Sequence, residues 1–456
     1  MRTRGLHMLE PLYTAEEMRA AEEAYPDYPD SVPELMDRAG RAVAEEALRA
    51  FPDARRFAAA CGKGNNGGDG RVALEVLRAA GRDAEETTDV AGADVVIDAL
   101  FGTGFRGVPR PEAADLIERM NRAGPPVVAV DIASGVNAST GEIEGAAVRA
   151  ALTVTFHGRK VGLEVAPGRF HAGEVVVADI GLEPALTEHA LVTREILRRV
   201  PARGPRDNKY SSGSVLVVGG APGFTGAACL AAEAAFRADA GYVAVAAPRE
   251  SLPVIEARLL EAVKRPLDEV FDAAGRASAL AIGPGLGRGD EVQALVRRLL
   301  AEVDLPAVVD ADALFGLEPL DRDAPTVLTP HEGELGRLLG EESRWVAAHR
   351  LEAARRAADT FGCVVVLKGA DTLVTAPREG TLVCALGSPA LATAGTGDVL
   401  TGIIGAFLAK GLDAKLAAAA GAAAQQVASA LAPRRGLVAG DVIAALPRAL
   451  EGVDAV

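Results

Sequence analysis

The sequence predicts a soluble α/β protein of two domains, and three observations lead to this fold class. Short, apolar, β-branched runs alternate along the chain with segments whose apolar residues recur at helical spacing. This alternation is typical of parallel sheets that helices cover on both faces. The chain has 456 residues, more than one hydrophobic core usually serves, and hydrophobic residues make up 49% of it. Because both halves show the same alternation, each half is expected to form a domain.

The charge of the chain argues against a nucleic acid partner. Lys and Arg number 48 against 63 Asp and Glu, a formal net charge of -15, which repels a phosphate-rich polymer but still allows a nucleotide in a local pocket. No apolar window is long enough for a membrane span, and the N-terminus lacks the apolar core of a signal peptide. The four cysteines are scattered without a CxxC spacing. We therefore expect neither disulfides nor a zinc site, no membrane partner, and a cytoplasmic location.

The expected strands divide into two groups on either side of a linker. The first half supplies apolar runs at Phe57–Cys61, Val95–Ala99, Val127–Val130 and Leu152–Phe156. The second half supplies Val215–Val218, Tyr242–Ala246, Leu280–Ile282, Ala307–Val309, Val327–Leu328 and Val364–Leu367. Residues 198–213 are rich in Arg, Pro and Gly and lack apolar periodicity, which predicts a linker. The two domains are expected to span residues 1–200 and 201–456.

A glycine-rich segment, GNNGGDG at residues 64–70, follows the first expected strand. Because Val72, Val76 and Ala80 then recur at helical spacing, we interpret the segment as a loop between strand and helix. Glycines let a backbone approach a ligand, and the N–H groups at a helix N-terminus bind anions. Neither a Walker loop nor the GxGxxG dinucleotide fingerprint fits the spacing. A glycine turn capped by Asp69 is the plainer alternative.

Two further strand ends pair glycines with oxygen donors. Asp98 precedes ALFGTGFRGV at 99–108, and Asp131 opens DIASGVN at 131–137. Ligands bind outside the carboxyl ends of strands in open α/β sheets, so the three segments are expected to converge on one crevice. Oxygen donors from Asn66, Asp98 and Ser134 suit a hard cation, and the backbone N–H groups of residues 102–108 suit a phosphate. Three unrelated turns are the alternative.

The second half carries its own glycine-rich turn, AGTGD at residues 394–398, before an apolar helix expected at 399–408. The N–H groups and the helix dipole would stabilise a transferring phosphoryl group, and Asp398 could accept the proton of an attacking hydroxyl. We expect the helix N-terminus to lower the pKa of Asp398. KGADT at 368–372, TPHEGE at 329–334 and GPGLG at 283–287 accompany the turn. Taken singly, Asp98 and Asp310 are interpreted as turn or cap residues, and His331 as a cap or core residue.

The first half resembles the NAD(P)H-hydrate epimerase family over roughly residues 1–190. The resemblance is carried by NNGGDG, by residues 98–107, by DIASGV at 131–136, and by YTAEEM and MDRAG at 13–18 and 36–40. It departs at Lys63 and Ala133, where that family often has proline. The resemblance implies a Rossmann-like three-layer sandwich, with potassium bound by Asn66, Asp98 and Ser134. It also implies substrate contacts from Asn65, Asn66, Gly67, Gly68, Asp69, Gly102, Thr103, Gly104, Phe105, Arg106, Gly107, Val108 and Asp131.

Inversion at the hydroxylated carbon of a hydrated nicotinamide ring needs a carboxylate that moves a proton and stabilises a cationic intermediate. Asp131 is the candidate for this role. Lys160, in FHGRKVG at 156–162, could contact the site, but an exposed loop lysine is the favoured interpretation.

The second half resembles the ribokinase-like fold and, more narrowly, the ADP-dependent NAD(P)H-hydrate dehydratase, over roughly residues 208–446. GGAPGFTGAA at 219–228 joins the segments above in this resemblance. It implies substrate contacts from Ala227, Gly285, His331 and Asp398, and adenine nucleotide contacts from Lys368, Gly369, Ala370, Asp371, Thr372 and Gly397. Asp398 would orient the ring hydroxyl toward the terminal phosphate of ADP, giving dihydronicotinamide, AMP and phosphate. Magnesium is expected to offset the phosphate charge.

Together the two resemblances predict one polypeptide for metabolite repair of hydrated NADH and NADPH. The N-terminal domain would epimerise the hydrates, and the C-terminal domain would dehydrate the S form. A vitamin or sugar kinase fused to a nucleotide-binding module is the alternative enzyme, and a half that only binds is the non-catalytic alternative. The TPHEGE segment and the NNGGDG half disfavour the kinase, since a kinase needs neither. We also expect a homo-oligomer.

Overall fold

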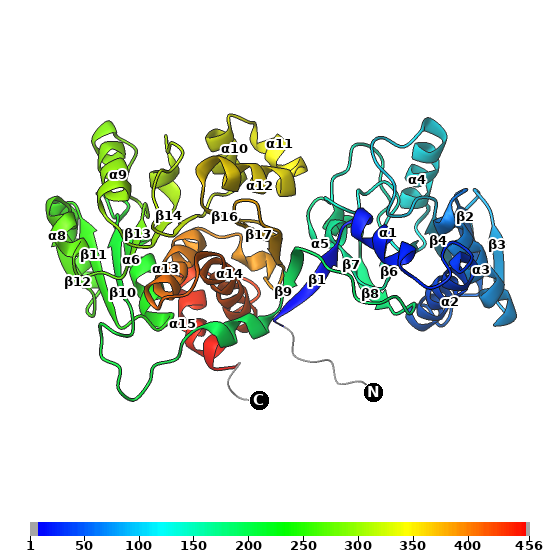
Figure 1. Cartoon of the computed structure of the whole chain (residues 1–456), viewed down its shortest axis with the longest axis horizontal. Coiled ribbons are helices and arrows are strands. Elements are labelled where there is room, and N and C mark those ends of the chain that lie inside the picture. Colours follow the sequence, from blue (N-terminus) through cyan, green and yellow to red (C-terminus); the bar gives the residue numbers. More distant parts are fainter. Residues whose placement is uncertain (1–7, 453–456) are drawn as a thin grey trace. The chain divides into compact units, whose positions relative to one another are not determined.

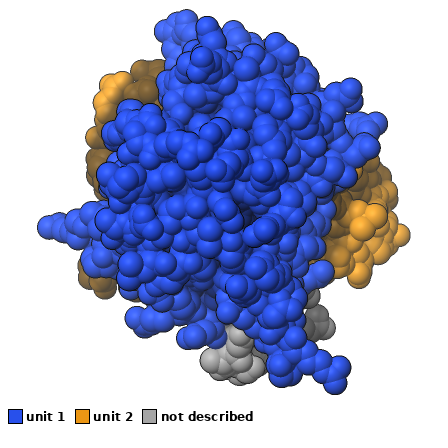
Figure 2. Space-filling view, turned by 90° about the vertical axis from the view of Figure 1, so that its left-hand side faces the viewer, with its two compact units in different colours: residues 1–10, 190–346, 352–456 blue, residues 11–189, 347–351 orange. Residues whose placement is uncertain are grey.

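The structure is a computed structural model that describes residues 8–452. Within these limits it divides into two compact units: unit 1 comprises residues 8–10, 190–346 and 352–452, and unit 2 comprises residues 11–189 and 347–351 (Figure 2). The expected domain limits at residues 200 and 201 stay predictions, and their outer ends, residues 1–7 and 453–456, lie outside the described residues. No helix among residues 8–452 is long and apolar enough to cross a membrane.

Unit 2 contains a six-stranded parallel sheet in the order β3-β2-β4-β5-β6-β8 (Figure 1). Its strands are β2 (Arg56–Cys61), β3 (Asp83–Glu86), β4 (Val95–Ala99), β5 (Val127–Val130), β6 (Leu152–Phe156) and β8 (Glu174–Ala178). The helices are α1 (Ala15–Glu23), α2 (Val32–Ala50), α3 (Asn65–Ala79), α4 (Pro111–Ala123) and α5 (Val161–Glu164), with a 3-10 turn η1 (Gly168–His171). A further parallel pair joins β1 (Leu9–Tyr13) to β7 (Arg159–Lys160).

Alternate residues of β2 face two different cores. Phe57 packs in the core that includes Leu74 of α3, and Ala58 packs in the core that includes Ile117 of α4. Successive side chains of a strand point to opposite faces, so a strand buried on both faces has a continuous apolar sequence. The expected Rossmann-like arrangement of a sheet between two helical layers is confirmed.

Unit 1 is built on a second sheet, in which β12-β11-β10-β13-β14-β15-β16 run parallel. β17 is antiparallel to β16 and β18, and β9 is parallel to β18. The strands are β9 (His189–Val192), β10 (Ser214–Val218), β11 (Tyr242–Ala247), β12 (Val263–Pro266), β13 (Ala279–Ile282), β14 (Ala307–Val309), β15 (Thr326–Leu328), β16 (Val364–Leu367), β17 (Thr372–Thr375) and β18 (Thr381–Cys384).

Several helices of this part of the chain share a hydrophobic core with that sheet. The helices are α6 (Thr225–Arg237), α7 (Leu252–Arg258), α8 (Val270–Ala274), α9 (Asp290–Glu302), α10 (Glu332–Leu339), α11 (Ser343–Ala348), α12 (Arg350–Phe361), α13 (Thr396–Ala409), α14 (Ala414–Leu431) and α15 (Ala439–Glu451). The 3-10 turns are η2 (Arg194–Arg199), η3 (Arg249–Ser251), η4 (Leu267–Glu269), η5 (Ala311–Leu314) and η6 (Pro389–Leu391). Because the central strands are parallel and adjacent, the segments that follow them begin at Gly219, Gly283, Asp310, Thr329 and Lys368 on one edge of the sheet.

The GNNGGDG segment is helical, which corrects its interpretation as a loop. α3 begins at Asn65 with Gly64 as its N-cap, well before the apolar spacing that starts at Val72. A Cβ on Gly67 would lie 2.0 Å from the carbonyl oxygen of Gly62, and one on Gly68 would lie 2.4 Å from the sulfur of Met36. The glycines therefore allow the first turns of α3 to pack against the end of β2 and against α2, although glycine lowers helix propensity.

Candidate functional sites

The first candidate site lies where β4 and β5 end, around the buried carboxylate of Asp98. The backbone N–H of Ser134 donates to Asp98 Oδ2 at 2.8 Å, and the Ser134 hydroxyl donates to Oδ1 at 2.6 Å. Ser134 Oγ also accepts the backbone N–H of Phe101 at 2.9 Å, and the Asn66 amide donates to the Phe101 carbonyl at 3.1 Å. The structure thus brings together Asn66, Asp98 and Ser134, although Asp98 alone was interpreted as a turn residue.

The surroundings of Asp98 fit a cation that prefers oxygen. Burial raises the pKa of Asp98 to about 6, and hydrogen bonds from Ser134 and Leu100 only partly offset the burial. These donors are neutral, so among the described residues the carboxylate has no cationic side chain as a partner. Carboxylate, hydroxyl, amide and carbonyl oxygens together form a donor set for a hard cation such as potassium.

The loop that follows β4 lies beside these oxygens. A Cβ on Gly102 would lie 3.2 Å from Asn66 Cβ, so the loop packs directly on the first turn of α3. The Arg106 guanidinium donates to the Asn137 side chain at 3.0 Å and pairs with Glu16. The rings of Phe101 and Phe105 stack with centroids 4.5 Å apart. The start of this loop therefore lies against the NNGGDG segment, and its later part is held by Asn137 and Glu16.

Asp131, which is partly exposed, forms an ion pair with the buried Lys160. Asp131 follows β5 with a φ of 65°, and Lys160 Nζ donates to its Oδ1 at 2.5 Å. The same ammonium donates to Thr155 Oγ1 at 2.9 Å and to the Phe156 carbonyl at 2.8 Å. Lys160 is 0% exposed, so the interpretation as an exposed loop lysine is wrong. The physical reason is tertiary: β7 pairs with β1, and three oxygen acceptors take the place of water around the charge.

Asp69 and Glu22 add two acids to the surroundings of Asp131. Burial, together with the negative charges of Asp131 and Glu22, raises the pKa of Asp69 to about 8. Burial and Asp131 also raise the pKa of Glu22, while Lys160 opposes them. The site therefore contains one carboxylate paired with a cation and another whose charged neighbours are acidic.

The second candidate site lies at the carboxyl ends of β14 and β16. Asp310 is 1% exposed. Its Oδ1 accepts from Lys368 Nζ at 2.8 Å, and its Oδ2 accepts from the Thr401 hydroxyl at 2.7 Å. Glu334 Oε2 lies 3.8 Å from the same Lys368 Nζ. Asp310 therefore joins β14 to Lys368 and to α13, and its interpretation as a cap or turn residue missed this role.

Asp398 lies in the first turn of α13, which begins at Thr396 after Gly395. Burial and the neighbouring Asp310 carboxylate raise its pKa to about 7, although Lys368 opposes the shift. The expectation that the helix N-terminus lowers this pKa is therefore wrong, because desolvation and a neighbouring carboxylate outweigh the dipole. Burial alone would lower the pKa of Lys368, but Asp310 and Glu334 raise it overall.

The residues predicted to bind the nucleotide lie close to Asp310 and Asp398. A Cβ on Gly397 would lie 3.4 Å from Lys368 Nζ, so the GTGD turn faces the lysine directly. Gly369 and Ala370 form an exposed turn that Thr372 closes by donating to the Gly369 carbonyl at 3.1 Å, and Asp371 is buried. The structure thus gathers the predicted nucleotide residues Lys368 to Thr372 and Gly397.

The remaining residues predicted to contact the substrate are His331, Ala227 in the segment 219–228 and Gly285 in the segment 283–287. The ring Nδ1 of His331 accepts the backbone N–H of Gly333 at 3.0 Å, and Glu334 accepts the backbone N–H of His331 at 2.9 Å, so His331 does cap α10. Gly285 has a φ of 59°, and a Cβ there would lie 3.2 Å from the Cβ of Ala227. Ala227 in the first turn of α6 and Gly285 after β13 are therefore neighbours.

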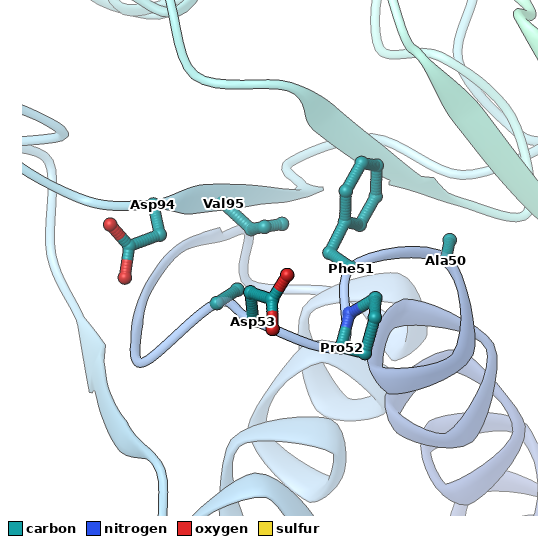
Figure 3. Close-up of a pocket in the computed structure, with 7 residues that line it drawn as sticks. Ala50, Phe51, Pro52, Asp53, Asp94 and Val95 are labelled. Atoms are coloured by element: carbon teal, nitrogen blue, oxygen red, sulfur yellow. The ribbon is translucent and has the colours of Figure 1, made fainter.

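A cavity of about 380 Å³ belongs to neither site (Figure 3). It lies at the amino ends of β2 and β4, and its lining includes Phe51, Asp53, Asp94 and Val95. The Asp94 carboxylate already accepts two backbone N–H groups, at 2.8 and 2.9 Å. Ligands of open α/β sheets bind at the opposite strand ends, so this hollow is not a candidate site.

Comparison with known proteins agrees with the division into two parts. Residues 215–448 match the sequence model of the NAD(P)H-hydrate dehydratase family, and residues 32–86 and 79–162 match that of the YjeF-related protein N-terminus. The chain is 37% identical to a bifunctional NAD(P)H-hydrate repair enzyme, Nnr, of Moorella thermoacetica, over 92% of each chain. It is 35% identical to the Nnr of Escherichia coli, over 91% of this chain and 89% of that one.

A solved structure is similar to the second half. The ADP/ATP-dependent NAD(P)H-hydrate dehydratase of Bacillus subtilis, co-crystallised with ATP and Mg²⁺, superposes with a TM-score of 0.53 at 30% identity. The match covers 57% of this chain and 97% of that one. The expected ribokinase-like fold of the C-terminal half is confirmed by this similarity and by that to a ribokinase-like protein of Enterococcus faecalis, with a TM-score of 0.53 and 23% identity.

Proposed function

The chain belongs to the family of bifunctional NAD(P)H-hydrate repair enzymes, and on this premise we propose how its two sites divide the repair. The N-terminal site interconverts the R and S epimers of hydrated NADH and NADPH. The C-terminal site dehydrates the S epimer at the expense of ADP and releases NAD(P)H, AMP and phosphate. The observation that carries this division is that each half has its own cluster of buried carboxylates at the carboxyl ends of a parallel sheet.

In the N-terminal site, the first turn of α3 and residues 102–108 bind the hydrated dinucleotide. Their backbone N–H groups face the phosphates, and Asp131 lies at the nicotinamide ring. An ionised Asp131 stabilises a ring cation that forms when the hydroxyl leaves. Lys160 positions Asp131 through its 2.5 Å hydrogen bond.

In the C-terminal site, Asp398 takes the proton of the ring hydroxyl as its oxygen attacks the terminal phosphorus of ADP. Lys368 and the N–H groups at the start of α13 stabilise the transferring phosphoryl group. AMP leaves, and the carbon–oxygen bond of the resulting phosphate ester then breaks as the ring nitrogen donates its electron pair, so that phosphate departs and a ring cation remains. The adjacent ring carbon then loses a proton to the departing phosphate, which gives the dihydronicotinamide. Ala227, Gly285 and His331 contact the hydrate, and residues 368–372 with Gly397 contact the nucleotide.

Each half is also proposed to use a metal ion. Asn66, Asp98 and Ser134 would hold potassium, which would offset the phosphate charge of the hydrate. Among residues 8–452, no group of three or more His, Cys, Asp or Glu side chains could hold a metal by itself. Magnesium usually binds through phosphates, waters and one or two carboxylates, so it would enter the C-terminal site with the nucleotide, with Glu334 as the nearby carboxylate. We further propose a cytoplasmic location and a homo-oligomer, the latter testable by light scattering.

One assay tests the proposal. The full chain is mixed with ADP, magnesium, potassium and both epimers of hydrated NADH, and the near-ultraviolet absorbance of dihydronicotinamide is followed. Recovery of all the absorbance is expected, and omission of ADP should stop it. Without ADP-dependent recovery the proposed function is wrong, whereas phosphorylation of a sugar or vitamin alone would favour the kinase alternative.

A further inference from the structure

The N-terminal site holds two carboxylates in unlike surroundings, and this difference bears on which group supplies a proton. Asp131 Oδ1 accepts three hydrogen bonds: from Lys160 Nζ at 2.5 Å, from Thr155 Oγ1 at 3.0 Å and from the backbone N–H of Phe156 at 3.2 Å. All three reach the same oxygen, so within the described residues Oδ2 of Asp131 is left for a ligand. Lys160 is 0% exposed and stabilises the negative charge of Asp131.

Asp69 has none of this support. The residue is 8% exposed, and no hydrogen bond or ion pair from the described part of the chain reaches its carboxylate. It lies in the helical turn formed by NNGGDG, where Gly67 and Gly68 bring α3 against its neighbours. A carboxyl group that is nine-tenths buried without a donor prefers the protonated form.

The charged groups around Asp69 strengthen this preference. They are the carboxylates of Asp131 after β5 and Glu22 on α1. α2 places Met36 against the same turn, and Asp98 of β4 is hydrogen bonded to Ser134. Burial and the two acids raise the pKa of Asp69 to about 8.

We infer that Asp69 is the general acid of epimerisation and that Asp131 is its basic partner, an inference that rests on the proposed epimerase function of this site. One carboxyl group buried without a hydrogen-bond donor, beside another that accepts a hydrogen bond from an ammonium, is the unlike pair that acid–base catalysis at neutral pH needs.

The step balances without an outside reactant other than water. Asp69 gives its proton to the ring hydroxyl, the carbon–oxygen bond breaks, and water leaves as the ring nitrogen forms a double bond to the same carbon. Water then adds to the opposite face of that carbon, and its proton goes to Oδ2 of Asp131. Exchange with solvent returns the proton to Asp69 and removes it from Asp131. The reverse conversion uses the same groups in the opposite roles.

The test compares Asp69→Asn with wild type in the full chain, using the pure R hydrate of NADH as the probe. Asparagine keeps the size and a hydrogen-bond donor but cannot release a proton. We expect kcat for epimerisation to fall by about 10²–10⁴-fold with KM nearly unchanged. Glu75→Gln, on the exposed side of the same helix, is the matched control and should keep the wild-type rate. ADP-dependent dehydration of the pure S hydrate, measured on the same samples, should stay unchanged.

The pH profile separates an acid from a structural residue. Wild-type epimerisation should decline as pH rises through about 8, because Asp69 then loses its proton. Asp69→Glu should keep part of the rate and such a limb, whereas Asp69→Asn should lose the limb. Circular dichroism checks that the variants fold. If Asp69→Asn does not fold, the decline of the wild-type epimerisation rate at high pH still tests the inference.

The outcomes are distinguishable. If wild type does not interconvert the epimers, the proposed epimerase function fails. If wild type does so but Asp69→Asn keeps its kcat, or raises KM alone, Asp69 only binds substrate and the inference is overturned. A wild-type rate that does not change between pH 7 and 9 would overturn it as well.

Discussion

Asp310 is a residue whose charge acts through its neighbours. It lies between Lys368 and Thr401 and raises the pKa of Asp398, which burial has already raised, to about 7. Asp398 must be ionised to accept a proton, so dehydration is expected to increase as pH rises through about 7. The carboxylate that raises this pKa is itself a positioning residue, because it also holds Lys368 beside Gly397.

Asp310→Asn should therefore move the pH dependence of dehydration. Removal of the negative charge lowers the pKa of Asp398, so the acid limb of kcat/KM should shift below that of wild type, although burial still keeps it above that of an ordinary Asp. The measurement is kcat/KM for the S hydrate at saturating ADP between pH 5.5 and 8.5. Asp290→Asn, an exposed acid at the start of α9, is the control. A limb that coincides with wild type would contradict the coupling.

The ion pair between Lys160 and Asp131 should contribute to the stability of unit 2. Lys160→Met leaves the partly exposed carboxylate of Asp131 without its cation, which should cost about 1–3 kcal/mol of unfolding free energy. Adding Asp131→Asn should restore part of the loss, since no unpaired charge remains. Trp345, the only tryptophan, lies in unit 1, whereas Lys160 and Asp131 lie in unit 2. The unfolding transition followed by tryptophan fluorescence should therefore be unchanged, while circular dichroism should show that unit 2 unfolds at a lower denaturant concentration. Equal stability of the single and double variants would argue against the ion pair.

At the scale of elements, the first turn of α3 depends on glycine. In Gly67→Ala the new methyl group would meet the Gly62 carbonyl, so the helix must shift away from β2, at about 1–3 kcal/mol for such overpacking. We expect epimerisation to be lost and dehydration to be kept. Gly64→Ala, where a Cβ would meet nothing within 4 Å, should retain most of the epimerase rate. The rates of both reactions for both variants check this, and equal epimerase rates would mean that the close packing is unimportant.

The elements best predicted from sequence are strands that are buried on both faces and therefore consist mainly of apolar residues. Val95–Ala99 and Leu152–Phe156 have the predicted bounds, because strands buried on both faces consist mainly of apolar and β-branched residues. The hairpin of β17 and β18 was not predicted, although both strands are fully buried. The extension of α3 over NNGGDG was hidden because glycine gives no helical signal.

The site was predictable to the extent that strand ends reveal it. The rule that selected Asp131 applies equally to Asp310, and weighing Asp310 together with the other strand ends would have found it. Its partners lie 58 and 91 residues away along the chain, so their hydrogen bonds depend on the tertiary fold. The burial of Lys160 and the raised pKa of Asp398 depend on such partners too, and no local spacing could show them.

For the whole molecule, the question is whether one chain must hold both active sites. The predicted epimerase residues all lie in unit 2, and the predicted dehydratase residues all lie in unit 1. Each reaction should therefore need one intact unit and no side chain from the other, and the hydrate that one chain epimerises can reach another chain through solution.

An equimolar mixture of Asp131→Ala and Asp398→Ala chains should then repair both epimers. Alone, Asp131→Ala should recover only the dihydronicotinamide of the S hydrate, and Asp398→Ala should recover none while still interconverting the epimers. Mixed with ADP, the two should bring the absorbance to the wild-type end point, because each supplies the reaction the other lacks. Chromatographic separation of the R and S hydrates during the reaction checks this. Persistence of the R hydrate in the mixture would mean that the two steps must occur within a single chain.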